Sequence, residues 1–165
     1  MLLAALFATA TALAAPEMIP LDAMEIVGHP APSVDLTLAD GSKFNFTRHK
    51  GRVLVLSFFA SWCGPCRLEL PELTRLAAER KDVDFLAVNV DRRRVDAEKF
   101  LRSVQVGLPI AYDTDARALG EFMAMSMPTT YVIDPKGNVF SKKVGFSKEK
   151  GLTELIGYID EAQKR

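Results

Sequence analysis

The stretch VLVLSFFASWCGPC, residues 53–66, decides the fold of this chain. Its first eight residues are almost continuously apolar and lack the alternation of a half-exposed strand, so they predict a central strand covered on both faces. Two cysteines follow, separated by Gly64 and Pro65. Proline suits the first turn of a helix, so the stretch predicts a buried strand that leads into a helix, with the cysteine pair at the junction.

Apolar spacing extends this prediction along the chain. A helix is expected up to about residue 80, kinked at Pro71, because five apolar residues recur at helical spacing: Leu68, Leu70, Leu73, Leu76 and Ala77. A second buried strand is expected at residues 83–90. Strand, helix and strand then form one right-handed parallel crossover.

The remaining segments predict a mixed α/β domain. Turn residues and hydrophobic patterns indicate a hairpin at 34–46, a helix at 95–104, an extended piece at 108–112, a helix at 116–123, antiparallel strands at 129–133 and 139–144, and a last helix at 148–163. We therefore expect a mixed sheet of four or five strands flanked by helices on both faces. The cysteines would lie at the carboxyl end of its central strand, where open α/β sheets place their sites.

Composition limits the possible functions. The chain has 165 residues, 48% of them hydrophobic, which suits a single domain with its own core. Its 21 basic and 21 acidic residues cancel, so no overall field favours nucleic acid. With two cysteines and two histidines, no structural zinc site is expected. A purely structural disulfide is the simplest alternative for the cysteines, but a two-residue loop restricts the unfolded chain very little.

The N-terminal segment predicts export. Residues 1–15 are apolar and end in small residues before Pro16, which is typical of a signal peptide and its cleavage site. No lysine or arginine precedes the apolar run, so a cleaved signal peptide and a retained membrane anchor both stay open. Residues 16–25 are interpreted as a linker and residues 26–165 as the folded domain, in a periplasmic or other extracytoplasmic location.

The segment from Trp62 to Cys66 predicts thiol chemistry. At a helix N-terminus, unpaired N–H groups and partial positive charge stabilise a thiolate, so Cys63 is the expected nucleophile. Cys66 lies close enough to attack the mixed disulfide that Cys63 forms with a substrate. Gly64 and Pro65 shape the turn, and Trp62 offers a flat apolar face beside the reacting sulfur.

Four segments together resemble one family. Residues 58–66, 67–71, 88–91 and 127–134 are similar to the thioredoxin superfamily, and the chain from about Ile26 looks like its exported TlpA/ResA/CcmG branch. The resemblance implies a thioredoxin-like fold with an N-terminal hairpin and a helical insertion before the cis-proline strand. It implies a thiol:disulfide oxidoreductase, and the Gly-Pro pair resembles that of reducing members.

The resemblance also implies partners. Outside the cytosol a reductase needs a membrane thiol electron donor, and its substrates would be protein disulfides, in apocytochrome c or a copper-site protein. A monomer is expected, with no nucleic-acid partner. No bound cofactor is expected, since the chain has no nucleotide-binding glycine motif.

Three positions take their roles from the resemblance. Pro128 is similar to the family's cis-proline, and Met127 would offer backbone hydrogen bonds to the substrate. Glu69 resembles an acidic residue of the exported branch, whereas Ser57 stands where cytosolic thioredoxins carry a buried aspartate. A partly buried Glu69 would exchange protons with Cys66; the alternative is an exposed glutamate that favours the helix N-terminus.

Other interpretations of the sequence stay open. Residues 31–34 and 40–41 resemble a peroxiredoxin-like peroxide reductase, although peroxiredoxins place a threonine near the position of Cys63. Three methionines, Met123, Met125 and Met127, are soft ligands that together with the thiolates suit copper handling for oxidase assembly, but methionine more often fills apolar space. Residues 92–94, three arginines, form either a solvated turn or a docking patch for an acidic partner. His29 and His49 receive no role.

Overall fold

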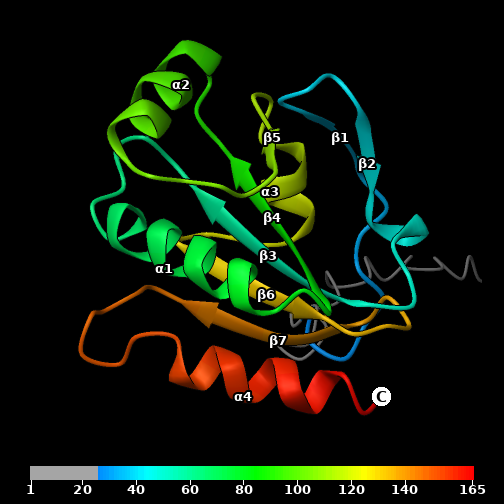
Figure 1. Cartoon of the computed structure of the whole chain (residues 1–165). Helices are drawn as coiled ribbons and strands as arrows, with labels where there is room; N and C mark the ends of the chain where they lie inside the picture. Colours follow the sequence, from blue (N-terminus) through cyan, green and yellow to red (C-terminus); the bar gives the residue numbers. More distant parts are fainter. Residues whose placement is uncertain (1–25) are drawn as a thin grey trace, which may run out of the picture.

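The computed structural model describes residues 26–165, so the predicted signal segment (1–15) and linker (16–25) lie outside the described residues. Seven strands form one mixed sheet, with helices packed against it (Figure 1). In chain order the elements are β1 (Asp35–Leu38), β2 (Lys43–Asn45), β3 (Val53–Phe59), α1 (Cys66–Glu79), β4 (Val83–Asn89), α2 (Arg94–Ser103), β5 (Ile110–Tyr112), α3 (Arg117–Glu121), β6 (Thr129–Ile133), β7 (Val139–Val144) and α4 (Thr153–Ala162).

The strand predicted to be central is central. β3 is buried along its whole length and lies between β4, which is parallel to it, and β6, which is antiparallel. α1 connects β3 to β4, as the predicted crossover requires. The unbroken apolar run therefore reports a strand with neighbours at both edges and packing on both faces.

The sheet is wider than predicted. Its order is β2-β1-β5-β4-β3-β6-β7, which is seven strands instead of four or five. The difference comes from the N-terminal hairpin and the short strand β5, because β1 pairs antiparallel with β5 and so joins the hairpin to the central sheet. Two- and three-residue ladders of this kind carry little hydrophobic periodicity, so a sequence pattern reveals the strands but not their pairing.

The two faces of the sheet carry separate cores. Alternate side chains of β3 point to opposite faces. Val53, Val55 and Phe59 pack with residues of α1, α2 and α4, whereas Leu54, Leu56 and Phe58 pack with α3, with Phe46 and with the N-terminal segment from Ile26. α1 and α4 cover one face of the sheet along much of its length (Figure 1). None of the helices within residues 26–165 is long and apolar enough to cross a membrane.

Two details of the helix predictions are wrong. α4 begins at Thr153 and not at residue 148, because Gly151 lies in the left-handed region at φ +53° and interrupts a continuous helix. Leu68, assigned to the apolar spacing of α1, is 41% exposed. In that first turn the residues on the buried side are Cys66 and Glu69. An acidic side chain therefore lies on the inner face of α1, where an apolar one was expected, and it marks the candidate site.

Candidate active site

The site forms where β3 and β4 end and β6 begins. In the sheet register Phe59 of β3 lies beside Asn89 of β4, and Phe58 lies beside Thr129 of β6. The loop that follows β3 therefore has the end of β4 on one side and the start of β6 on the other. This places the cysteine pair at the carboxyl end of the central strand, as predicted.

Cys63 and Cys66 form a disulfide at the start of α1, with their Cα atoms 5.3 Å apart. Both residues are buried, at 4% and 0% exposure, so the first cysteine is the slightly more accessible one. The backbone N–H of Cys66 points at Cys63 Sγ, with a nitrogen–sulfur distance of 3.1 Å. A donor already directed at this sulfur favours negative charge on it once the disulfide is reduced.

The residues predicted to contact substrate lie on two sides of the disulfide, in the active-site loop and just before β6. Trp62 is 72% exposed, and Gly64 and Pro65 are exposed next to it. On the other side the Met127–Pro128 peptide bond is cis, as the family resemblance implied, and Pro128 is buried. Met127 packs against the hydrophobic cluster that contains Cys63 and Cys66. The roles of all five residues in binding stay predictions.

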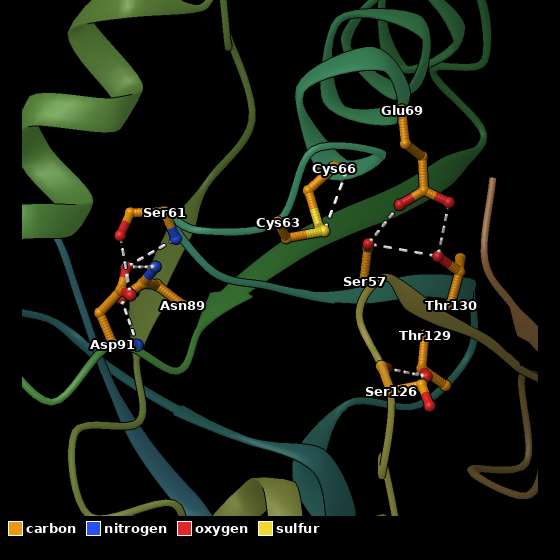
Figure 2. Close-up of a disulfide and its surroundings, with 10 residues drawn as sticks. All are labelled: Ser57, Ser61, Cys63, Cys66, Glu69, Asn89, Asp91, Ser126, Thr129 and Thr130. Carbon is orange, nitrogen blue, oxygen red and sulfur yellow. Dashed lines mark hydrogen bonds between the residues drawn. A yellow bond between two sulfur atoms is a disulfide. The ribbon is translucent and has the colours of Figure 1, made fainter. Parts of the chain in front are cut away.

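Glu69 is buried on the inner face of α1, at 1% exposure. Its Oε2 accepts a hydrogen bond of 2.9 Å from the Ser57 hydroxyl, and its Oε1 accepts one of 3.0 Å from the Thr130 hydroxyl (Figure 2). Burial raises the pKa of this carboxyl, an effect that the two hydroxyl groups and Lys143 only partly oppose. The interpretation of Glu69 as an exposed first-turn glutamate is therefore wrong.

A second buried acid was missed from the sequence. Asp91, just beyond β4, accepts hydrogen bonds from the Ser61 backbone N–H at 2.9 Å, the Ser61 hydroxyl at 3.0 Å and the Asn89 side-chain amide at 2.8 Å (Figure 2). These bonds attach the loop before Trp62 to the end of β4. The available signal was the pair of polar residues closing an apolar strand at residues 83–91.

Glu69, Ser57 and Thr130 form what we call the Glu69 cluster, and the sequence also held a signal for its two hydroxyl residues. Ser57 interrupts the otherwise apolar strand β3, and Thr130 is the second of two threonines that begin β6; both are buried. A buried hydroxyl in a central strand needs a hydrogen-bond partner. Ser57, noted as a departure from the buried aspartate of thioredoxins, supplies instead a hydrogen bond to an acid carried by the helix.

The other candidate residues are dispersed. Met125 is almost fully exposed, whereas Met123 and Met127 are partly buried and pack against the core. Within residues 26–165 no three histidine, cysteine, aspartate or glutamate side chains gather as metal ligands. Of the three arginines, Arg93 pairs with Asp96 and Arg94 pairs with Glu98. The partly buried His49 lies beside Asp84 at the opposite end of β3 from the disulfide.

The fold and the disulfide together define a class. A mixed sheet with a Cys-x-x-Cys disulfide between its central strand and the next helix, faced by a cis-proline, is that of a thioredoxin-fold thiol:disulfide oxidoreductase. Residues 27–142 match the model of the AhpC/TSA family. Since the match covers well over half of the sequence, the chain belongs to this family.

Named relatives place the chain more closely. It is 29% identical over 134 residues to the thiol-disulfide oxidoreductase ResA of Bacillus subtilis, covering 80% of this chain and 75% of the relative. The Bacillus cereus ResA is 28% identical over 81% of this chain and 76% of its own length. A solved Chlorobium tepidum protein, described as a DsbE-type thiol:disulfide interchange protein, superimposes with a TM-score of 0.75 at 32% identity, over 81% of this chain and 94% of its own.

These relatives confirm the predicted TlpA/ResA/CcmG-like branch and the predicted thioredoxin-like fold. They also favour thiol–disulfide exchange over the peroxiredoxin-like alternative, because they are named for thiol–disulfide chemistry. The reaction of this chain is therefore thiol–disulfide exchange through Cys63 and Cys66.

Proposed function

We propose that this protein reduces disulfides of other proteins outside the cytoplasm, with Cys63 as nucleophile and Cys66 as the resolving thiol. The observation that carries the assignment is the hydrogen bond from the Cys66 N–H to Cys63 Sγ at the first residue of α1. Backbone N–H groups at a helix N-terminus stabilise an anion, so Cys63 has the lower-energy thiolate of the pair.

In the first step the Cys63 thiolate attacks one sulfur of the substrate disulfide. A bond forms between Cys63 Sγ and that sulfur, and the substrate's other sulfur leaves as a thiolate that takes a proton from water. Trp62 covers one side of the reacting sulfur. Met127 supplies backbone groups for an extended substrate segment, and cis-Pro128 holds that segment against the disulfide.

In the second step Cys66 closes the reaction. Its thiol gives a proton to the Glu69 carboxylate, and the resulting thiolate attacks Cys63 Sγ, which releases the reduced substrate and forms the Cys63–Cys66 disulfide. Cys66 and Glu69 are three residues apart on α1 and so lie on the same side of the helix. Burial raises the pKa of Glu69, which makes its carboxylate a better base for a thiol.

The enzyme then needs two electrons from outside. A membrane thiol protein is the proposed donor, with the apolar segment 1–15 acting as export signal or anchor and residues 26–165 as the catalytic domain. The substrates are protein disulfides, with apocytochrome c maturation as the proposed setting. The family resemblance and the ResA-type relatives support this assignment.

The reduction potential of the Cys63/Cys66 couple tests the direction of the reaction. The purified full chain is equilibrated with dithiothreitol or glutathione buffers and its thiols are trapped. A value near that of thioredoxin, about −270 mV, supports a reductase, whereas a value near about −120 mV would make the protein an oxidant. A pair that does not titrate reversibly would remove the proposal altogether.

A further inference from the structure

A groove begins two residues before Cys63. Its volume is about 450 Å³, and it runs from the active-site loop between the first turn of α1 and the side of α2. We call it the α1–α2 groove, and its lining residues are Ser61, Arg67, Asp96, Lys99, Phe100 and Ser103. Ser61 belongs to the loop that hydrogen bonds attach to Asp91, so the end of the groove nearest the disulfide lies on an anchored loop.

Arg67 is held in this groove and makes no ion pair with an acidic side chain of residues 26–165. Its guanidinium lies 4.7 Å from the centre of the Phe100 ring, and its Nη1 donates a hydrogen bond of 2.7 Å to Ser103 Oγ. Phe100 is itself buried in the core. The arginine is therefore oriented by an aromatic face and a hydroxyl, neither of which carries negative charge, and other N–H groups of its fork can bind a ligand.

Basic side chains outnumber acidic ones around the groove. Residues 92–103 carry five basic side chains, Arg92, Arg93, Arg94, Lys99 and Arg102, and two acidic ones, Asp96 and Glu98. Both acids already pair, with Arg93 at 3.0 Å and Arg94 at 2.8 Å. Among the ion pairs of residues 26–165 none involves Arg67, Arg92, Lys99 or Arg102. The chain as a whole is neutral, so this excess is local.

We propose that the α1–α2 groove binds an acidic segment of the substrate protein, next to the disulfide that Cys63 attacks. The inference rests on the proposed reductase function and adds the class of substrate. A carboxylate that enters the groove meets the Arg67 fork and the Lys99 ammonium, and arginine binds carboxylates with two parallel hydrogen bonds. The long-range attraction also speeds the encounter of an acidic partner with the thiolate.

The geometry gives the acidic segment a direction. Pro128 and Met127 lie on the β6 side of the disulfide, and the α1–α2 groove begins at Ser61 on the β4 side. Figure 2 shows Ser61 and the Ser126–Thr130 segment on opposite sides of the cysteines. A substrate held at Pro128 with its sulfur at Cys63 therefore extends toward the groove within a few residues, at about 3.3 Å per residue.

Three peptides test the inference. Each contains the same short disulfide loop, flanked on both sides by aspartate and glutamate, by serine, or by lysine. The reduced full chain is mixed with each peptide, and oxidation is followed through Trp62, the single tryptophan of the chain. We expect the acidic peptide to react about 10-fold faster than the serine peptide at low ionic strength, and the advantage to shrink at about 0.5 M salt.

Two charge reversals locate the effect. Lys99→Glu is expected to lower the preference for the acidic peptide over the serine peptide at least about 3-fold and to raise the relative rate of the lysine peptide. Lys50→Glu is the matched control. Lys50 is exposed and precedes β3, at the end of that strand opposite the cysteines, so the same charge change there leaves the preference unaltered.

The outcomes separate this inference from the reductase proposal. Equal rates for the three peptides, or an acidic preference that survives Lys99→Glu, would overturn the groove assignment while leaving the reductase intact. Binding to phosphatidylserine vesicles that Lys99→Glu abolishes, with no peptide preference, would assign the groove to a lipid surface and also overturn it. If none of the peptides is reduced, the reductase proposal fails and the inference fails with it.

Discussion

Two buried acids lie on opposite sides of the same disulfide and are bonded in different ways. Asp91 accepts hydrogen bonds from a backbone N–H, a side-chain amide and a hydroxyl, whereas within residues 26–165 Glu69 accepts only from the hydroxyls of Ser57 and Thr130 (Figure 2). Backbone and amide N–H groups can only donate, so they require an acceptor at Asp91 at all times. Hydroxyls donate or accept, so the Glu69 cluster accommodates the carboxyl with or without its proton.

This difference indicates that the two acids have different functions. The Asp91 cluster fixes the loop that carries Trp62 and Cys63, and it loses its hydrogen bonds if the acid is changed. The Glu69 cluster keeps a carboxyl of raised pKa beneath the helix turn of Cys66. A position that tolerates both protonation states suits proton transfer, and one that tolerates a single state suits support.

Removal of the sulfur between the two acids gives the largest effect. Cys63→Ser is expected to lower the rate of disulfide exchange at least about 1,000-fold, because a hydroxyl does not replace the thiolate nucleophile at neutral pH. Cys66→Ser is the matched variant: it still attacks substrate but stalls at the mixed disulfide, which mass spectrometry detects. A mixed disulfide in Cys63→Ser and none in Cys66→Ser would reverse the assigned roles.

The Asp91 cluster is expected to dominate stability. Asp91→Ala leaves the Ser61 N–H and the Asn89 amide buried without an acceptor, which we expect to lower the free energy of unfolding by about 3 kcal/mol. Urea denaturation of the oxidised protein measures this loss. The exchange rate falls with it, because the loop before Cys63 is no longer attached to β4.

An exposed aspartate controls for the loss of charge. Asp115→Ala removes the same side chain from a surface position, so its free energy of unfolding is expected to stay within about 0.5 kcal/mol of the starting protein. Equal losses for the two variants would mean that Asp91 does not support the loop.

Glu69→Gln is expected to have opposite effects on activity and stability. Without the carboxylate base the resolving step slows about 10-fold at neutral pH, and it recovers toward alkaline pH, where Cys66 ionises unaided. The raised pKa of Glu69 means that the folded state favours the protonated acid, so native stability falls as pH rises through that pKa. Glutamine carries no charge, so the variant is more stable than the starting protein at neutral pH and similar to it in acid.

Stopped-flow mixing with a disulfide peptide and urea denaturation across pH measure the two effects separately. Reduced stability in Glu69→Gln at neutral pH would show that the carboxylate is a structural partner like Asp91. Unchanged turnover at every pH would remove Glu69 from the mechanism while leaving its burial intact.

The sequence predicts one of these two acids and not the other, for a physical reason. Glu69 lies three residues from Cys66 on a predicted helix, and the family resemblance singles out an acidic residue at this position. Asp91 is 28 residues from Cys63 along the chain, and its role depends on the parallel register that brings the end of β4 beside the loop after β3. Local patterns predict helices and buried strands well; they do not reveal which polar loop residues a long-range ladder brings together.

The same limit explains the sheet. An almost continuous apolar run predicts the central strand β3, whereas the extension of the sheet to seven strands depends on the pairing of Thr37 and Leu38 with Tyr112 and Ala111. A two-residue contact between distant segments has no periodicity of its own. The α1–α2 groove was equally hidden, because it is formed by Arg67 and Lys99 on two different helices.

The smallest expected effect separates the hydroxyls from the acid that they contact. Ser57→Ala removes a hydrogen bond that lowers the pKa of Glu69, so this pKa rises further. Because the carboxylate is the base, the resolving step then begins to slow at a higher pH as the pH is lowered. The lost bond is stronger to the carboxylate than to the protonated acid. The variant is therefore less stable by about 1–2 kcal/mol above the pKa of Glu69 and closer to the starting protein below it.

Ser141→Ala gives a matched control within the same sheet. Ser141 is also a buried strand serine, but its hydroxyl has no hydrogen-bond partner among residues 26–165. Its removal is expected to leave the pH dependence of resolution unchanged and to have little effect on stability, since no bond is lost. If both serine variants shift the pH profile equally, the shift arises from the sheet as a whole, and the hydroxyl donors do not set the proton affinity of Glu69.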